Sequence, residues 1–117
     1  IICCYSNKKI IFNRTSVVDK FLEHPRVMIF GEEGEEKVFI SSSDWMTRNL
    51  DNRVEVTCPI YDEDIKKEII ETYTICWNDN VKARQITAAQ DNAYRKNDKV
   101  PLRSQFATYD YYLNKLN

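Results

Sequence analysis

Two apolar runs separated by a turn rich in glycine and glutamate constrain the fold of this chain most strongly. The first run, residues 26–30, ends at Phe30, and the second, residues 37–43, follows the turn Gly31–Glu36. Aromatic and β-branched runs that flank a glycine-containing turn are typical of a β-hairpin. Pro25 precedes the first run and disfavours helical backbone at the residue before it. We therefore expect a hairpin, with its first strand, residues 27–30, buried on both faces.

Polar side chains gather at one end of this predicted hairpin. His24, the only histidine in the sequence, and Arg26 stand at the start of the first strand, and Ser43 and Asp44 follow the second. Imidazole and guanidinium donors beside small hydroxyls suit a site that binds phosphate. Structural alternatives remain open, because a lone histidine is more often structural and residues 41–44 could end a strand and cap a helix.

Arg48 and Asn49 follow this cluster within the same segment. Side chains of these types could support a phosphate site from its edge. They could equally be solvated groups that pair with Asp51 and Arg53. The sequence leaves both interpretations open.

The other segments show local signals for strands, helices and one loop. We expect short strands over 1–5 and 9–12, a short helix after Thr15-Ser16 that ends at Pro25, a strand over 53–59, a helix that opens at Asp62 and stops at 78–80, a loop or arm over 85–99, and a helix over 103–116. Strands that alternate with helices indicate the α/β (α+β) class.

Size and composition favour one domain over residues 1–117. The apolar fraction of 43% indicates a core, and the net charge of -1 argues against a nucleic-acid-binding protein. No apolar run has the roughly 18 residues of a transmembrane helix, and no signal peptide is recognisable. We therefore expect a cytoplasmic protein. The first residue is not Met, so we also expect a piece of a longer chain.

The four cysteines match neither a disulfide framework nor a metal site. Cys3 and Cys4 are adjacent, Cys58 and Cys76 stand alone on apolar segments, and no C-x-x-C motif occurs. We expect buried or partly buried free thiols in a reducing cytoplasm, and no metal ligands.

Several blocks of the sequence resemble the C-terminal domain of bacterial polyphosphate kinase of the large, histidine-phosphorylated type. They are residues 18–27, residues 40–56 with Ser43-Asp44-Trp45-Met46-Thr47-Arg48-Asn49, residues 80–84 and the tail 99–111. The resemblance runs from about Thr15 to the end of the chain. It implies half of a phospholipase D-like fold, here the second such domain, with a mixed β-sheet flanked by helices.

The resemblance also implies an activity. The full-length enzyme would transfer the γ-phosphate of ATP reversibly to polyphosphate through a phosphohistidine in the preceding domain, so the isolated chain would be inactive. His24 would be catalytic and would contact the nucleotide's phosphates together with Arg26. Ser43, Asp44 and the pair Arg48 and Asn49 would support the site.

The implied substrates and partners are ATP or ADP, inorganic polyphosphate, the upstream domains of the same chain and further copies in a homo-oligomer. Mg²⁺ would assist the full-length enzyme, which would be cytoplasmic or part of a membrane-associated complex. The family's ATP-contacting arginine has no match in residues 1–14. Two alternatives remain open: a phospholipase D-like phosphodiesterase half-domain, and a non-catalytic module that binds polyphosphate.

Overall fold

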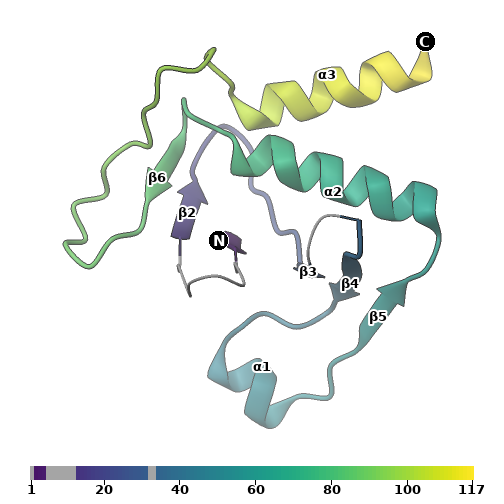
Figure 1. Cartoon of the computed structure of the whole chain (residues 1–117). Helices are drawn as coiled ribbons and strands as arrows, with labels where there is room; N and C mark the ends of the chain where they lie inside the picture. Colours follow the sequence, from purple (N-terminus) through teal and green to yellow (C-terminus); the bar gives the residue numbers. More distant parts are fainter. Residues whose placement is uncertain (1, 5–12, 32–33) are drawn as a thin grey trace. The chain divides into compact units, whose positions relative to one another are not determined.

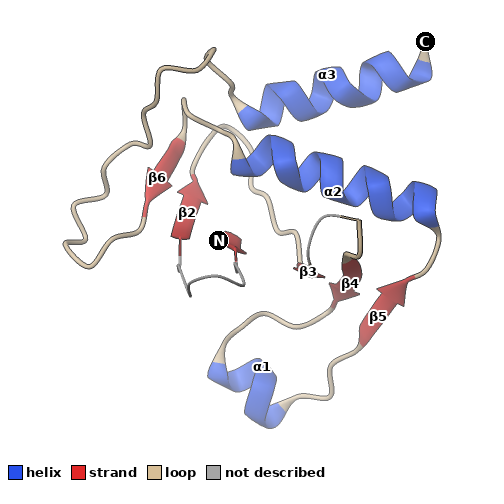
Figure 2. Cartoon of the chain, in the orientation of Figure 1, coloured by secondary structure: helices blue, strands red, loops and turns tan. Residues whose placement is uncertain are grey.

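The computed structural model describes residues 2–4, 13–31 and 34–117, in two compact units (Figure 1). The elements in chain order are β1 (Ile2–Cys4), β2 (Asn13–Val17), β3 (Val27–Phe30), β4 (Lys37–Ser41), α1 (Thr47–Asn52), β5 (Thr57–Ile60), α2 (Glu63–Trp77), β6 (Ala83–Gln85) and α3 (Ser104–Leu116). The first unit comprises Ile1–Leu22 with Glu71–Asn117, and the second comprises Glu23–Ile70. Both contain helix and strand (Figure 2), which confirms the α/β (α+β) class.

The described strands form two three-stranded sheets, and each pairing within them is antiparallel. The first unit contains the order β1-β2-β6 and the second the order β3-β4-β5. The single mixed sheet that the resemblance implied is therefore not found among the described strands. Parallel neighbours need a long crossover connection, whereas a short turn joins β3 to β4 and permits only antiparallel pairing.

The hairpin predicted from the two apolar runs is present as β3 and β4. Val27 lies opposite Ile40, and the turn begins at Gly31 with φ of 116°. A Cβ at Gly31 would lie 2.8 Å from the carbonyl oxygen of Glu35, so the turn requires glycine. The register brings the start of β3 beside the end of β4, where the N–H of Ser41 donates to the carbonyl oxygen of Arg26 at 2.9 Å.

The burial predicted for β3 is wrong. Val27 is 37% exposed and Phe30 is 55% exposed, so the described residues do not fully cover the faces of β3. A continuous apolar run does not show whether other elements cover both faces of a strand. β5 also differs from its prediction, since it begins at Thr57 rather than Arg53 and continues past Pro59. Proline is tolerated there because β5 is an edge strand.

The helix predicted after Thr15-Ser16 is replaced by strand β2 and a loop. β2 pairs with β1 on one side and β6 on the other, so the sheet satisfies its backbone groups. A helix of this length is marginal by itself, and the sheet pairing outweighs its propensity. His24 consequently lies in a loop rather than at a helix end. The strand predicted over 9–12 lies outside the described residues. Of the strand predicted over 1–5, the described residues form β1.

The long helix α2 begins and ends as predicted. Asp62 caps it, since its Oδ1 accepts hydrogen bonds from the N–H groups of Asp64 and Ile65 at 3.0 Å each. Beyond its end, Asp79 is fully buried. Its carboxylate accepts hydrogen bonds from four backbone N–H groups, those of Val81, Lys82, Ala83 and Ser104. Asp79 thus joins the start of β6 to the start of α3.

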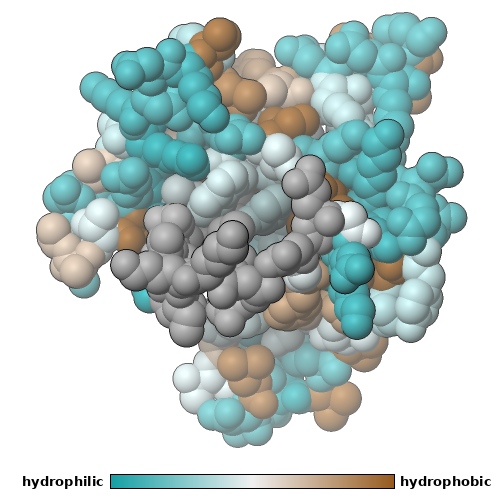
Figure 3. Space-filling model, in the orientation of Figure 1, coloured by the Kyte–Doolittle hydropathy of each residue, from teal (hydrophilic) through white to brown (hydrophobic). Residues whose placement is uncertain are grey.

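Apolar side chains of α3 and of the loop before α1 are largely exposed. Tyr109 is 65% exposed and Trp45 79% exposed, and apolar atoms lie at the surface in Figure 3. Among the described hydrophobic residues only Val38 and Ala83 are buried. The core expected from the apolar fraction is therefore small within this chain. The apolar stripe predicted for α3 is present but is not covered by the described residues.

The described cysteines and helices complete the fold. Cys58 is exposed on β5, contrary to the prediction of buried or partly buried thiols. Cys76 is half-buried, as predicted, and is in no disulfide. Among the described residues, neither α2 nor α3 nor the short α1 has the length and apolar character that crossing a membrane would require.

Candidate functional site

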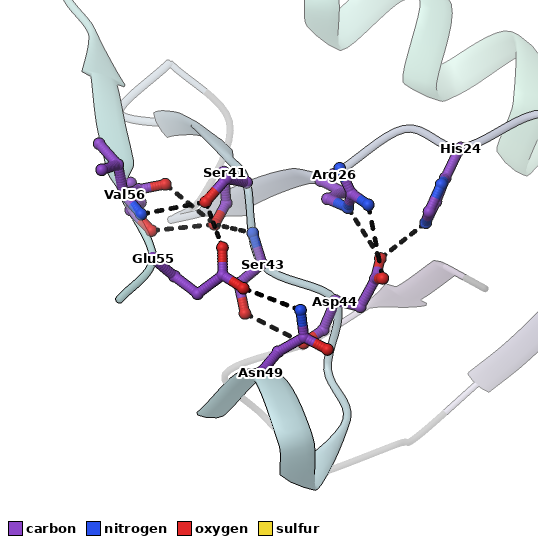
Figure 4. A network of polar contacts seen from close by, with 10 residues as sticks. His24, Arg26, Ser41, Ser43, Asp44, Asn49, Glu55 and Val56 are labelled. Atoms are coloured by element: carbon purple, nitrogen blue, oxygen red, sulfur yellow. Dashed lines mark hydrogen bonds and ion pairs between the residues drawn. The ribbon is translucent and has the colours of Figure 1, made fainter. Parts of the chain in front are cut away.

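The carboxylate of Asp44 lies between the imidazole of His24 and the guanidinium of Arg26, and all three residues belong to the second unit. Its Oδ1 is 2.6 Å from Nε2 of His24 and accepts a hydrogen bond from Nε of Arg26 at 2.7 Å. Its Oδ2 is 3.4 Å from Nη2 of Arg26. Figure 4 shows the imidazole and the guanidinium converging on this one carboxylate. The site is therefore an imidazole–carboxylate–guanidinium cluster.

The charges of this cluster reinforce one another. Hydrogen bonding to Arg26, and then to His24, lowers the pKa of Asp44 from 3.8 to about 2. The same bond raises the pKa of Arg26 above its ordinary value. Asp44 is thus ionised at neutral pH, and an ionised carboxylate only accepts hydrogen bonds. The Nε2 atom of His24 therefore carries the proton that it shares with Asp44, which leaves Nδ1 directed elsewhere.

The cluster is accessible to a ligand. The side chain of His24 is 60% exposed, that of Arg26 is 33% exposed and that of Asp44 is 20% exposed. The carboxylate of Asp44 is the least exposed of the three side chains, as expected for a group that orients two hydrogen-bond donors without contacting the ligand itself. The guanidinium of Arg26 has N–H groups beyond the two that face Asp44, and these can bind an oxyanion.

Hydrogen bonds with β5 hold the segment that carries Asp44. The hydroxyl of Ser41 lies 3.1 Å from that of Thr57, and the N–H of Ser43 donates to Ser41 Oγ at 3.1 Å. Ser43 Oγ in turn donates to the carbonyl oxygen of Asp44 at 3.0 Å. Residue 46 rather than Asp44 precedes α1 as its N-cap. The serines therefore shape a loop, and the alternative in which residues 41–44 cap a helix is not observed.

Glu55 joins the site through two further hydrogen bonds and was not predicted from the sequence. Its Oε2 accepts a hydrogen bond from Ser42 Oγ, and its Oε1 accepts one from Nδ2 of Asn49 at 2.8 Å. The bonds from Ser42 and Asn49 lower the pKa of Glu55. No motif marks this glutamate, because its partners are defined by the pairing of β4 with β5.

Asn49 and Arg48, the remaining predicted residues, differ in their contacts. Asn49 is only 2% exposed and contacts Glu55, so it does not pair with Asp51 or Arg53. Arg48 is exposed on α1 and makes no hydrogen bond or ion pair within the described part of the chain. The structure thus brings together His24, Arg26, Asp44 and, around them, Ser43 and Asn49, but it leaves Arg48 apart.

The described residues contain no group of three or more His, Cys, Asp or Glu side chains placed to hold a metal ion. The cluster itself has one acid, Asp44, and its carboxylate already pairs with His24 and Arg26. These side chains do not fit a metal centre. They fit an anion, which would contact the exposed imidazole and guanidinium.

Comparison with known proteins identifies the family to which this domain is similar. The family model described as polyphosphate kinase C-terminal domain 2 matches residues 2–105. The polyphosphate kinase of Vibrio vulnificus (strain YJ016) is 48% identical over 100 residues, which cover 85% of this chain and 14% of that protein. The polyphosphate kinase of Escherichia coli (strain K12) is 44% identical over 97 residues, which cover 82% of this chain and 14% of that protein.

A solved structure agrees with these relatives. The crystal structure of polyphosphate kinase from Porphyromonas gingivalis matches with a TM-score of 0.83 and 45% sequence identity, over 88% of this chain and 16% of that one. Fold and site thus define an α+β domain that carries an exposed imidazole–carboxylate–guanidinium cluster. The chain belongs to the polyphosphate kinase family, as its C-terminal domain 2. It spans 14% of the length of the curated relatives that it matches first.

Proposed function

We propose that the protein to which this domain belongs transfers the γ-phosphate of ATP reversibly to polyphosphate through a phosphohistidine in another domain. This domain supplies His24 and Arg26 as contacts for the nucleotide's phosphates, and Asp44 orients both. The proposal draws on membership in the polyphosphate kinase family and on the chemistry of the cluster. It is a proposal about the whole protein, of which this chain is a small part.

One observation carries the proposal for the site. A single carboxylate holds an imidazole at 2.6 Å and a guanidinium at 2.7 Å, while both of these groups remain partly exposed to solvent. A purely structural ion pair would not need the histidine. Arg26 and Asp44 together are close to neutral, so a proton on the second ring nitrogen of His24 would make the cluster cationic overall. That arrangement suits a phosphate that gains charge on its outer oxygens during transfer.

The chemistry assigned to each side chain follows from its donors. Phosphoryl transfer passes through a loose transition state, so positioning and charge stabilisation supply most of the catalysis. Arg26 would bind a phosphate oxygen through the N–H groups that do not face Asp44. His24, with both ring nitrogens protonated, would donate from Nδ1 to a γ-phosphate oxygen or to the oxygen that leaves with ADP. Asp44 would keep the ring in the orientation that directs Nδ1 outward.

The proposal extends to substrates, partners and location. ATP or ADP and polyphosphate are the substrates, the upstream domains of the same chain complete the site, and the enzyme assembles as a homo-oligomer in the cytoplasm, where ATP is available. Mg²⁺ would accompany the nucleotide in the full-length enzyme. The described side chains do not form a site for the ion.

Label transfer from ATP tests the division of labour between the domains. Incubated with γ-labelled ATP, the full-length protein should acquire an acid-labile label and make polyphosphate, whereas the 117-residue chain should acquire none. The reason is that His24 is the only imidazole in this chain and is assigned to phosphate contact. Acid-labile label on His24 in the isolated chain would contradict this role. A full-length protein that hydrolyses phosphodiesters and makes no polyphosphate would contradict the activity.

A further inference from the structure

Glu55 is a half-buried carboxylate at the edge of the site, and the proposed reaction assigns it no role. Asn49 Nδ2 donates to its Oε1 at 2.8 Å (Figure 4). Ser42 Oγ donates to its Oε2. Hydrogen bonds from Ser42 and Asn49 lower the pKa of Glu55. The side chain is therefore an ionised acceptor that engages two separate donors, one with each oxygen.

The two donors lie on either side of Asp44 in the sequence. Ser42 precedes it, and its backbone N–H donates to the carbonyl oxygen of Val56 at 3.0 Å, while its Oγ accepts from the N–H of Val56 at 3.1 Å. Asn49 follows Asp44 and is linked to it through Met46. The N–H of Asn49 donates to the carbonyl oxygen of Met46, and the N–H of Met46 donates to the carbonyl oxygen of Asp44, at 2.9 Å each. Glu55 thus anchors both ends of the loop that presents Asp44.

The burial of Asn49 supports this interpretation. Its side chain is 2% exposed, and its Oδ1 has no hydrogen-bond partner among the described residues. A buried amide oxygen without a hydrogen-bond partner is unfavourable, so the hydrogen bonds of the NH₂ group must offset its cost. The bond from Nδ2 to Glu55 is the contact that accounts for an asparagine at this position.

We propose that Glu55 is a positioning residue for phosphoryl transfer. By holding Ser42 and Asn49 it sets the position of the Asp44 carboxylate, which in turn orients the imidazole of His24 and the guanidinium of Arg26. Glu55 does not itself contact the substrate. This inference rests on the proposed function, since it concerns the geometry of the same site.

Steady-state kinetics of the full-length enzyme test it through a double-mutant cycle. Glu55→Ala should lower kcat on the order of 10²-fold with a smaller change in KM for ATP, as expected when donors shift by about 1 Å. Combined with Asp44→Asn, it should cause little further loss, because both changes act through the same carboxylate. Glu35→Ala, which removes an exposed glutamate of the β3–β4 turn, should leave kcat unchanged.

Two outcomes overturn the inference: kcat of Glu55→Ala close to wild type, or losses that multiply in the double variant. If Glu55→Ala does not fold, Ser42→Ala is tested instead. Ser42 is exposed, and the change removes one of the two hydrogen-bond donors to Glu55. Ser42→Ala should then lower kcat and be non-additive with Asp44→Asn, and a wild-type kcat would overturn the inference. A normal kcat for Asp44→Asn alone would instead count against the proposed function itself.

Discussion

The Oδ1 atom of Asp44 lies 2.6 Å from Nε2 of His24, although 20 positions separate the two residues in the sequence. The hairpin register creates this proximity, because it places the start of β3 beside the end of β4. The same oxygen accepts a hydrogen bond from Arg26. One carboxylate therefore determines the orientation of both the imidazole and the guanidinium.

Asp44→Asn in the full-length enzyme should lower turnover with little loss of stability. The amide keeps the shape of the side chain but loses the charge, and its NH₂ group would face donors where a carboxylate oxygen now accepts. Partly exposed ion pairs contribute about 0–1 kcal/mol, so the melting temperature should change little. Polyphosphate synthesis and thermal unfolding measure the two effects. Asp51→Asn, an exposed position on α1, is the control; destabilisation with normal turnover would assign Asp44 to structure.

His24→Ala should reduce the rate of polyphosphate synthesis by roughly 10²–10⁴-fold, the range typical for removal of a general acid or base. His24→Gln keeps a hydrogen-bond donor but cannot transfer a proton, so it should restore ATP binding more than turnover. ATP affinity and initial rates of the full-length variants separate these contributions. Leu22→Ala changes an exposed side chain in the same loop and should have no effect. Wild-type binding and synthesis in His24→Ala would make His24 a structural residue.

Arg26→Ala should raise the pKa of Asp44 from about 2 toward 3.8, because hydrogen bonding to Arg26 is the main cause of the lowered value. In the wild type the carboxyl should remain ionised as the pH falls through 3.8 and become protonated only near 2. Carboxyl ¹³C chemical shifts recorded against pH report this directly. Arg48→Ala is a matched control, since Arg48 makes no ion pair in the described structure. An unchanged midpoint in Arg26→Ala would show that the pair does not form in solution.

Asp79→Asn should destabilise the chain by about 2–4 kcal/mol, because a buried carboxylate that accepts several backbone hydrogen bonds is replaced by a group with only one acceptor oxygen. Burial alone would raise the pKa of Asp79, but the bonds from Ser104, Lys82 and Ala83 outweigh it and lower the pKa. The stabilisation is therefore present above pH 3.8, its ordinary value, and declines as the pH falls below it.

Urea unfolding of the Asp79→Asn chain at pH 7 and at pH 3 measures this effect. The difference from wild type should be larger at pH 7. Asp98→Asn makes the same change at an exposed position of the first unit and should give no difference at either pH. A pH-independent difference would mean that the charge of Asp79 contributes nothing to stability.

Local signals predicted the elements whose cause is local. The Gly31 turn between apolar runs predicted the β3–β4 hairpin, and Asp62 with the acids after it predicted the start of α2. Both depend on backbone preferences and hydrogen bonds within a few residues. Those preferences failed for the residues after Thr15, where pairing with β1 and β6 outweighed a weak helix signal.

The sequence by itself determined the residue types of the site: one imidazole, one guanidinium two positions later and a carboxylate after the next strand. Only the tertiary structure decided that Asp44 faces both His24 and Arg26, that Arg48 does not join them, and that Glu55 holds the loop from the segment before β5. These contacts depend on the register of paired strands, and a shift of one residue would turn every side chain to the other face. Register arises from interactions between segments distant in sequence, so no local pattern contains it.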